Sequence, residues 1–186
     1  MGHHTFDADR ADRLEDAGRR YRYLSREELL GALDPSTDDV LADLGSGTGF
    51  YTDDVAPHAG TVYAVDVQEA MHEHYREKGV PENVELVTSD VAELPFEAGL
   101  LDGAFSTMTY HEFASDAAVD GLAAAVRSGG RVVIVDWSAD GAGESGPPVD
   151  ERYAARDARA ALERSGFEIE SITSRPETFL VVAVAP

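Results

Sequence analysis

The chain has 186 residues, 36 acidic and 15 basic, so its formal net charge is −21, and it contains no cysteine. This length predicts one domain with a single hydrophobic core. The lack of cysteine excludes disulfide frameworks, cysteine-ligated zinc sites and thiol nucleophiles. No run approaches the roughly 18 apolar residues that a membrane span needs, and the polar N-terminus is unlike a signal peptide. We therefore expect a soluble, cytoplasmic protein with no membrane span.

The acidic residues are spread along the whole chain and form no tail. A dispersed excess predicts a negative surface that repels itself in dilute buffer. Molar salt shortens the Debye length to about 3 Å and removes most of that repulsion. We therefore expect a halophilic source. The same negative surface argues, weakly, against binding to nucleic acid.

The first 33 residues predict one or two helices. Apolar and aromatic residues recur there at helical spacing, and Ser25 followed by Glu28 forms a capping box. Residues 34–36 (Asp-Pro-Ser) end the helical pattern. The segment either closes a binding site as a lid or packs on the sheet as an ordinary amphipathic helix. The helices that would close the site carry Arg19, Arg20, Tyr21 and Tyr23.

Five apolar runs follow, separated by segments of helical or turn character. They are rich in Val, Ile and Leu, which is typical of strands buried on both faces, and their alternation with helices predicts a parallel sheet. The runs cover residues 40–44, 61–67, 84–89, 101–108 and 131–137.

The last quarter of the chain predicts one helix and a hairpin. The helix spans residues 151–165 and ends at Gly166. Two strands, at 167–174 and 178–185, are joined by three residues, which is too short for a parallel crossover, so the pair must be antiparallel. The stretch 142–148 (AGESGPP) predicts a flexible loop after the fifth strand.

A glycine-rich turn, residues 43–49 (DLGSGTG), follows the first strand and opens a helix. Such a turn brings backbone N–H groups against a ligand at a helix N-terminus, although it also occurs for purely structural reasons. Asp66 ends the second run, 17 residues after Gly49. An acid there can accept two hydrogen bonds from a ribose diol, or it can cap a helix that starts near Gln68.

Five segments in this order resemble class I S-adenosylmethionine-dependent methyltransferases, particularly the small branch related to the quinone and sterol enzymes: DLGSGTG, AVDVQ, SDVAELPF, LDGAFSTMTYHEF and VRSGGRVVIVDW. The resemblance covers about residues 38–137. The GxGxG spacing, preceded by Asp43, differs from the GxGxxG of dinucleotide enzymes. The resemblance implies an α/β fold: a Rossmann-like three-layer sandwich around a seven-stranded, mostly parallel sheet with an antiparallel last strand.

The resemblance also implies one methyltransferase domain over residues 1–186. Within it, 1–35 would be an N-terminal helical segment or lid, and 36–137 the cofactor-binding core. Residues 138–186 would supply the C-terminal helix and β-hairpin.

For the cofactor, S-adenosyl-L-methionine, the resemblance implies a role for each matched position. Asp43 would hold the amino group, directly or through water. Asp66 would bind the ribose hydroxyls, and Asp90 the adenine amino group, unless Asp90 only starts an ordinary turn and helix. The remaining cofactor-binding candidates are Gly45, Ser46, Gly47, Thr48 and Gly49 for the methionine part, Val67 and Gln68 for the adenosine, Val91 for a ring nitrogen and Thr107 near the methyl group.

Methyl transfer from a sulfonium is a direct displacement, so the protein has to align the reactants and exclude water. Where the acceptor is an OH or NH group, His111 is the candidate base, Glu112 is the alternative, and a structural role for His111 is equally compatible with the sequence. Tyr23, Tyr110 and His111 would contact the substrate. His58, His72 and His74 are interpreted as surface residues, and we expect no metal.

In the family that the sequence resembles, substrates are gripped by the N-terminal segment and by the insert after the fifth strand. That insert is short here, so the resemblance implies a small-molecule substrate. No basic, aromatic-interleaved patch predicts RNA binding. The chain would act as a monomer or homodimer. Two alternatives remain: a non-catalytic S-adenosylmethionine-binding regulatory protein, and an NAD(P)-dependent oxidoreductase, which the glycine spacing and the hairpin disfavour.

Overall fold

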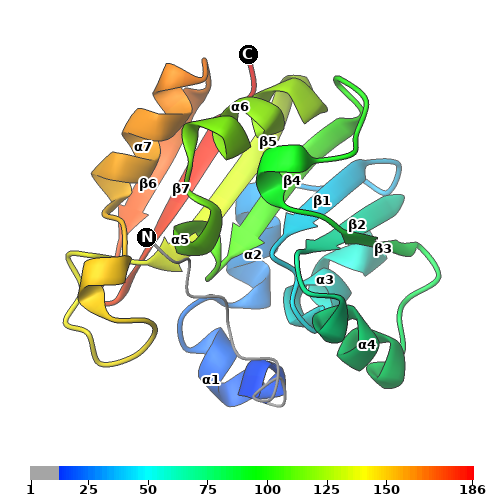
Figure 1. Ribbon diagram of the computed structural model, residues 1–186, viewed down its shortest axis with the longest axis horizontal. Helices are drawn as coiled ribbons and strands as arrows, with labels where there is room; N and C mark the ends of the chain where they lie inside the picture. The colour runs from blue at the N-terminus through cyan, green and yellow to red at the C-terminus, as the bar shows by residue number, and fades with distance from the viewer. Residues whose placement is uncertain (1–12) are drawn as a thin grey trace.

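The structure is a computed structural model that describes residues 13–186. Part of the predicted N-terminal segment, residues 1–12, lies outside the described residues. One seven-stranded sheet forms the centre, in the order β3-β2-β1-β4-β5-β7-β6 (Figure 1). The strands are β1 Val40–Leu44, β2 Thr61–Asp66, β3 Val84–Thr88, β4 Leu101–Thr107, β5 Val126–Trp137, β6 Glu168–Ser174 and β7 Thr178–Val184.

The pairing of the strands confirms the predicted topology. The first five strands pair in parallel, and β7 is antiparallel to both β5 and β6. Most strand ends lie within a residue or two of the predicted ends, but β5 begins at Val126, five residues before its predicted start. Residues 126–130 (VRSGG) are polar and glycine-rich, and a register shift between Leu101 and Gly103 of β4 admits them to the ladder.

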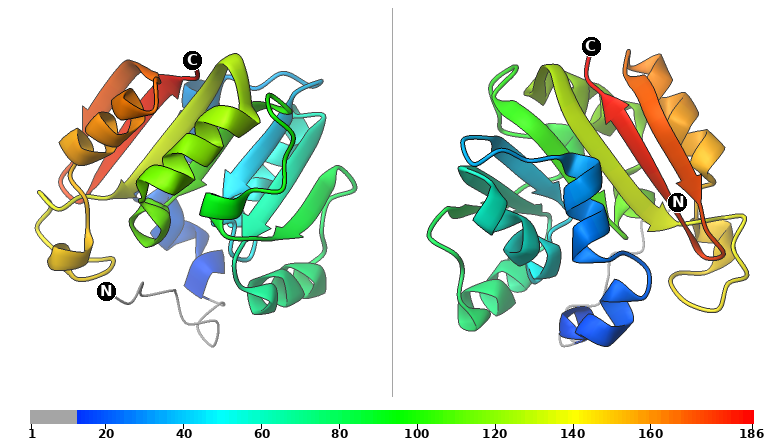
Figure 2. Two further views of the ribbon diagram at one scale, coloured as in Figure 1. Left: turned by 45° about the horizontal axis from the view of Figure 1, so that its top comes forward. Right: turned by 180° about the vertical axis from the view of Figure 1, so that it is seen from behind.

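Helices cover both faces of the sheet (Figure 2). One face carries α2, α3 and α4, and the other carries α5, α6 and α7. The predicted cap is confirmed in part, since Ser25 accepts a hydrogen bond from the Glu28 amide at 3.2 Å and starts α2. The α-helices are α1 Ala17–Tyr21, α2 Arg26–Leu33, α3 Phe50–Val55, α4 Glu69–Lys78, α5 Tyr110–Phe113, α6 Asp116–Ala125 and α7 Ala155–Arg164, with short 3-10 helices η2 Ala56–His58, η3 Val91–Glu93 and η4 Val149–Glu151.

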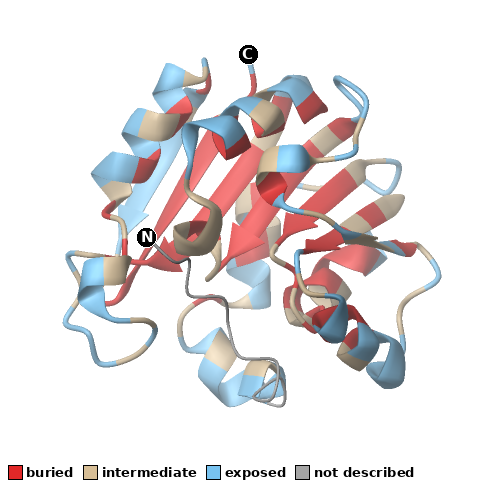
Figure 3. Ribbon diagram, in the orientation of Figure 1, coloured by how far each residue is buried: buried red, intermediate tan, exposed pale blue. Residues whose placement is uncertain are grey.

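The central strands are buried on both faces (Figure 3), as their continuous apolar runs predict. Alternate residues enter opposite cores: Ala104 and Val132 pack under α6 and α7, whereas Phe105 and Val133 pack under α2 and α3. The edge strand β6 is mostly exposed.

Within residues 13–186, no helix is long and apolar enough to cross a membrane.

The strand order changes direction between β1 and β4, because β1 pairs with β2 on one side and with β4 on the other. In an open parallel sheet, ligands bind beyond the carboxyl ends of the strands at this point. Helix α1 lies below these ends in Figure 1. The fold therefore places the N-terminal segment over the expected ligand crevice.

Candidate functional site

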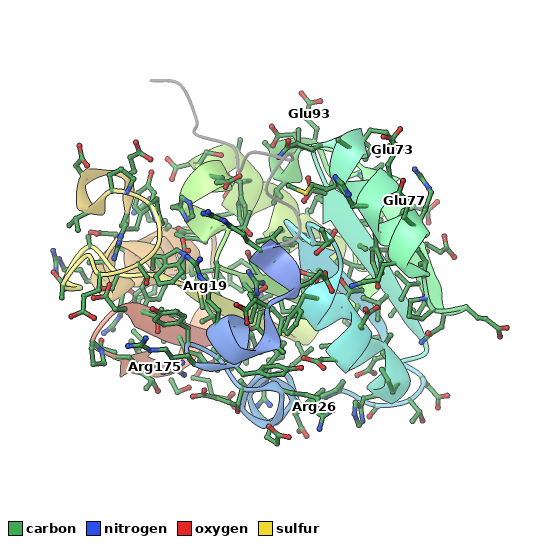
Figure 4. The ribbon with its side chains drawn as sticks, turned by 90° about the horizontal axis from the view of Figure 1, so that it is seen from below. Arg19, Arg26, Glu73, Glu77, Glu93 and Arg175 are labelled. Atoms are coloured by element: carbon green, nitrogen blue, oxygen red, sulfur yellow. The ribbon has the colours of Figure 1, made fainter. Side chains whose placement is uncertain are left out.

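A cavity of about 620 Å³ opens at the carboxyl ends of the parallel strands. Its size fits a nucleoside-sized ligand together with a small second molecule. Seen from below (Figure 4), α1 crosses this face of the molecule, and Arg19 lies near the middle of the face. Most of the residues predicted to form a site line this one cavity: Tyr23, Gly45, Ser46, Gly47, Thr48, Asp66, Val67, Gln68, Asp90, Val91, Thr107, His111 and Glu112.

The glycines of the turn are required mainly by the protein's own packing. Gly45 and Gly49 have φ angles of 77° and 78°, in the left-handed region. A Cβ on Gly45 would lie 2.2 Å from the Thr109 side chain, and one on Gly49 would lie 2.1 Å from the Tyr75 ring. Gly49 does not line the cavity. The expected close approach to a ligand therefore applies to residues 45–48.

Asp66 connects the glycine turn to the end of β2. Its carboxylate accepts hydrogen bonds from the amides of Gly47, at 2.8 Å, and Gln68, at 2.9 Å. Burial raises the pKa of Asp66 despite these hydrogen bonds. Gln68, not Asp66, occupies the N-cap position of α4, so the helix-cap interpretation of Asp66 is wrong. Asp66 instead holds the turn and the β2–α4 connection in place at the cavity wall.

Asp43 is 1% exposed and lies behind the turn, without lining the cavity. The Thr52 hydroxyl donates to its Oδ2 at 2.7 Å, whereas its Oδ1 is buried with no hydrogen-bond partner. Burial raises the pKa of Asp43 to about 7. A buried carboxylate with an unpaired oxygen is costly when ionised and favours a nearby cation. Its predicted contact with an amino group stays a prediction.

Replacing Asp43 with asparagine should stabilise the ligand-free protein at about pH 8, by roughly 1 to 2 kcal/mol. A carboxyl whose pKa is raised by folding binds more protons in the folded state, so its contribution to stability is lost as pH rises through about 7. The amide keeps an acceptor for Thr52 and removes this loss. The test is the free energy of urea unfolding, measured from about pH 5 to pH 8. Asp150→Asn, at an exposed position, is the control. An equal pH dependence in D43N and the parent would contradict the prediction.

Asp90 caps the short helix η3, since its Oδ1 accepts from the Ala92 amide at 2.8 Å. The turn-and-helix interpretation of Asp90 therefore describes its local structure. Asp90 and Val91 also line the cavity, so the cap leaves a ligand contact open. Thr107 ends β4 and also lines the cavity.

His111 and Asp136 form a pair near the ends of β4 and β5, whereas Asp90 follows β3 at the edge of the sheet. The His111 Nδ1 lies 3.0 Å from both carboxylate oxygens, and the His111 amide donates to Oδ2 at 2.7 Å. The Trp137 amide donates to Oδ1 at 2.8 Å. Asp136 is fully buried near the end of β5. His111 Nε2 lies 3.9 Å from Glu112 Oε1.

Two opposing effects set the pKa of His111. Burial lowers it, but the hydrogen bond and the negative charge of Asp136, with Glu112 and Glu151 adding to them, outweigh burial and leave it raised. With a carboxylate at Nδ1, the neutral ring carries its proton there and Nε2 is the acceptor. Asp136 was not predicted, although the sequence carries a signal for it: an acid near the end of a buried strand, as with Asp43.

Two expectations about individual side chains are wrong. Tyr110, expected at the substrate mouth, is 2% exposed and packs against Phe113 and Tyr153, with ring centroids 5.5 and 5.8 Å away. The four-residue helix α5 turns Tyr110 into the core and His111 toward the cavity. His72, expected on the surface, is fully buried, and its Nδ1 lies 3.1 Å from the Thr88 hydroxyl. His58 is exposed, as predicted.

The N-terminal segment is fastened over the cavity at several points. The Tyr51 hydroxyl donates to the Leu24 carbonyl at 2.9 Å, and the Tyr21 hydroxyl donates to Asp54. The Tyr23 ring packs on Trp137, with centroids 4.7 Å apart. Both Tyr23 and Trp137 line the cavity, so the segment contributes to its wall.

The loop predicted to be flexible is held by a buried arginine. Arg152 donates from Nε to the Pro147 carbonyl at 2.9 Å, and its Nη1 lies 3.2 Å from Glu177 Oε2. Gly146, Pro147 and Pro148 line the cavity. Helix α7 begins at Ala155 and not at the predicted residue 151, because the backbone at Arg152 is extended.

Comparison with known proteins bears on this arrangement. A family model described as a methyltransferase domain matches residues 42–134, which is half of the chain. A solved S-adenosylmethionine-dependent methyltransferase from Aquifex aeolicus has 26% identity and a TM-score of 0.86, over 98% of this chain and all of that one. A geranyl diphosphate C-methyltransferase from Streptomyces coelicolor shares the fold, with a TM-score of 0.76 at 15% identity over 90% of this chain and 80% of that one.

A curated demethylmenaquinone methyltransferase from Corynebacterium kroppenstedtii is 30% identical over 116 residues, 62% of this chain. The chain spans 49% of that relative's length, and between 22% and 60% of the lengths of the four curated relatives that it matches. The family match agrees with the sheet topology, and with the glycine turn and Asp66 at the carboxyl ends of β1 and β2. The chain therefore belongs to the methyltransferase domain family.

Proposed function

We propose that this methyltransferase, whose methyl donor is S-adenosylmethionine, methylates a hydroxyl or amine group of a small molecule. The observation that carries the proposal is the His111–Asp136 pair, because His111 lines the same cavity as the glycine turn and Asp66 and Asp136 supports it from behind. An OH or NH acceptor has to lose a proton, whereas a thiolate acceptor does not, so a buried histidine–carboxylate pair suits the first two.

The described residues fit the cofactor. Asp66 offers carboxylate oxygens at the end of β2, where a ribose diol would bind, and the turn 45–48 lines the adjoining wall. Asp90 and Val91 line the part of the cavity proposed for adenine. The buried, unpaired Oδ1 of Asp43 suits a nearby ammonium group. When bound, S-adenosylmethionine supplies an electrophilic methyl group on a sulfonium, which an acceptor atom takes in one displacement.

His111 would take the acceptor's proton at Nε2. Asp136 would hold the ring through Nδ1 and stabilise the imidazolium that forms, as the carboxylate does in other histidine–carboxylate pairs. Glu112 Oε1, 3.9 Å from Nε2, is the alternative base. The Tyr23–Trp137 contact and α1 would exclude competing water as a lid.

A small acceptor is supported by the shared cavity of about 620 Å³, much of which a nucleoside cofactor would occupy. The names of two similar proteins, a demethylmenaquinone methyltransferase and a geranyl diphosphate C-methyltransferase, also give small-molecule acceptors, although the second is methylated at carbon. The demethylmenaquinone methyltransferase also supports the more specific assignment of this chain to the branch related to quinone enzymes. The net charge of −21 supports a halophilic source. Membership of the methyltransferase family favours catalysis over a regulatory protein or an oxidoreductase.

The proposal is tested in two steps with the purified chain in about 2 M KCl, where its charges are screened. Calorimetric titration should detect S-adenosylmethionine and S-adenosylhomocysteine but not NADH. A panel of phenols, hydroxy acids and amines is then incubated with S-adenosylmethionine, and methylated products are identified by mass spectrometry. Binding of NADH alone would contradict the cofactor, and methylation confined to thiols would contradict the acceptor chemistry.

A further inference from the structure

Arg20 is a half-buried cation on α1 that lines the same cavity as the glycine turn. Its guanidinium carbon lies 4.8 Å from the Tyr51 ring centroid and 5.5 Å from that of Phe50. Its Nε is buried and has no hydrogen-bond partner. Stacking on two rings fixes the plane of the guanidinium but leaves this donor unused.

The surroundings of Arg20 do not fully compensate its charge. Burial lowers the pKa of Arg20 below its ordinary value, and the nearby Tyr51, Asp43 and Glu15 offset only part of that effect. An incompletely paired cation with a buried, unused donor is costly, and an anionic ligand group in the cavity would reduce the cost.

Asp43, which begins the glycine turn, has an unpaired acceptor where Arg20 has an unpaired donor. Its Oδ1 is also buried without a partner, and its charge acts on Arg20. The structure thus holds one unsatisfied cationic donor and one unsatisfied anionic acceptor around the glycine turn. Such a pair matches a zwitterion, which has an ammonium and a carboxylate on one carbon.

We propose that Arg20 binds the carboxylate of the amino-acid part of S-adenosylmethionine. Arg20 belongs to α1, so the cofactor would fasten the N-terminal segment over the site. The Tyr51 hydroxyl already connects the two, donating to the Arg20 carbonyl at 3.1 Å from the helix that follows the glycine turn. Tyr23, three residues on, packs on Trp137 at the acceptor end. The inference depends on the cofactor and not on the chemistry of the acceptor.

The test compares two ligands that differ in the amino-acid part. S-adenosylhomocysteine has it, and 5′-methylthioadenosine lacks it while keeping the adenosine and the sulfur. In calorimetric titrations, Arg20→Gln should weaken the affinity for S-adenosylhomocysteine at least about 10-fold. It should change the affinity for 5′-methylthioadenosine less than about 2-fold. Arg20→Lys keeps the charge but lacks the planar guanidinium, so its affinity for S-adenosylhomocysteine should lie between those of the parent and R20Q. Arg22→Gln, at an exposed position at the end of the same helix, is the matched control and should bind both ligands like the parent.

Equal losses for both ligands in R20Q would overturn the inference, because they would show that Arg20 only supports the shape of the site. An unchanged affinity for S-adenosylhomocysteine would overturn it as well. Thermal unfolding of each variant checks that the chain is folded, and if R20Q unfolds, the ligand comparison is made with R20K. A parent that bound neither nucleoside would instead overturn the cofactor assignment itself, which separates the two failures.

Discussion

Replacing His111 with glutamine is expected to lower kcat by about 10²- to 10⁴-fold, the range that a positioned general base contributes. The affinity for S-adenosylhomocysteine should stay close to that of the parent, because the hydrogen bonds that hold Asp66 to the glycine turn and to the Gln68 amide do not involve His111. The measurement is the rate of methyl transfer to an acceptor found in the panel. A variant that loses thermal stability and keeps kcat would show that His111 is a structural histidine.

The pH dependence separates the role of Asp136 from a merely structural one. A general base works in its neutral form, so the parent's kcat should fall as pH drops through the raised pKa of His111. Asp136→Asn removes the charge and weakens the hydrogen bond that raise this pKa. The acidic limb should therefore move to lower pH in D136N, while the plateau falls. A lower plateau with an unmoved limb would contradict the positioning role.

Most of the fold could be predicted because its signals are local. The continuous apolar runs of β1 to β4 set the strands almost to the residue, and three residues between β6 and β7 permit only a hairpin. Hydrophobic patterning fails to predict the structure where polar residues are part of a strand or are buried. Residues 126–130 extend β5 although they are polar, and His72 is buried although its type favours the surface.

The site could be predicted in part for a similar reason. Parallel strands end at one edge of the sheet, so residues at the ends of strands, such as Asp66 and Thr107, converge whatever the loops do. Adjacent residues of a short helix are harder, because about 100° of rotation separates Tyr110 from His111 and four residues carry no periodicity to set the phase. Contacts between distant segments, such as Asp136 with His111, leave no spacing in the sequence to read.

Arg152→Met should lower the free energy of unfolding by about 3 to 5 kcal/mol, the usual loss when one partner of a buried ion pair is removed. The side chains of Arg152 and Glu177 are 1% and 8% exposed, and their closest atoms are 3.2 Å apart. Methionine fills a similar volume but leaves the Glu177 carboxylate without its cation. It also removes the donor to the Pro147 carbonyl, so the loop that lines the cavity loses an anchor. We therefore expect KM for the acceptor to rise along with the loss of stability.

Urea unfolding in high salt measures the loss, and Arg156→Met is its matched control. Arg156 pairs with Asp140 at 2.9 Å on the same segment, but both side chains are more than half exposed, so breaking this pair should barely move the midpoint. The double variant R152M/E177L should recover part of the stability, because it removes the unpaired charge and leaves apolar side chains in its place. If R152M and R156M had equal midpoints, the Arg152–Glu177 pair would not be what holds the loop at the cavity.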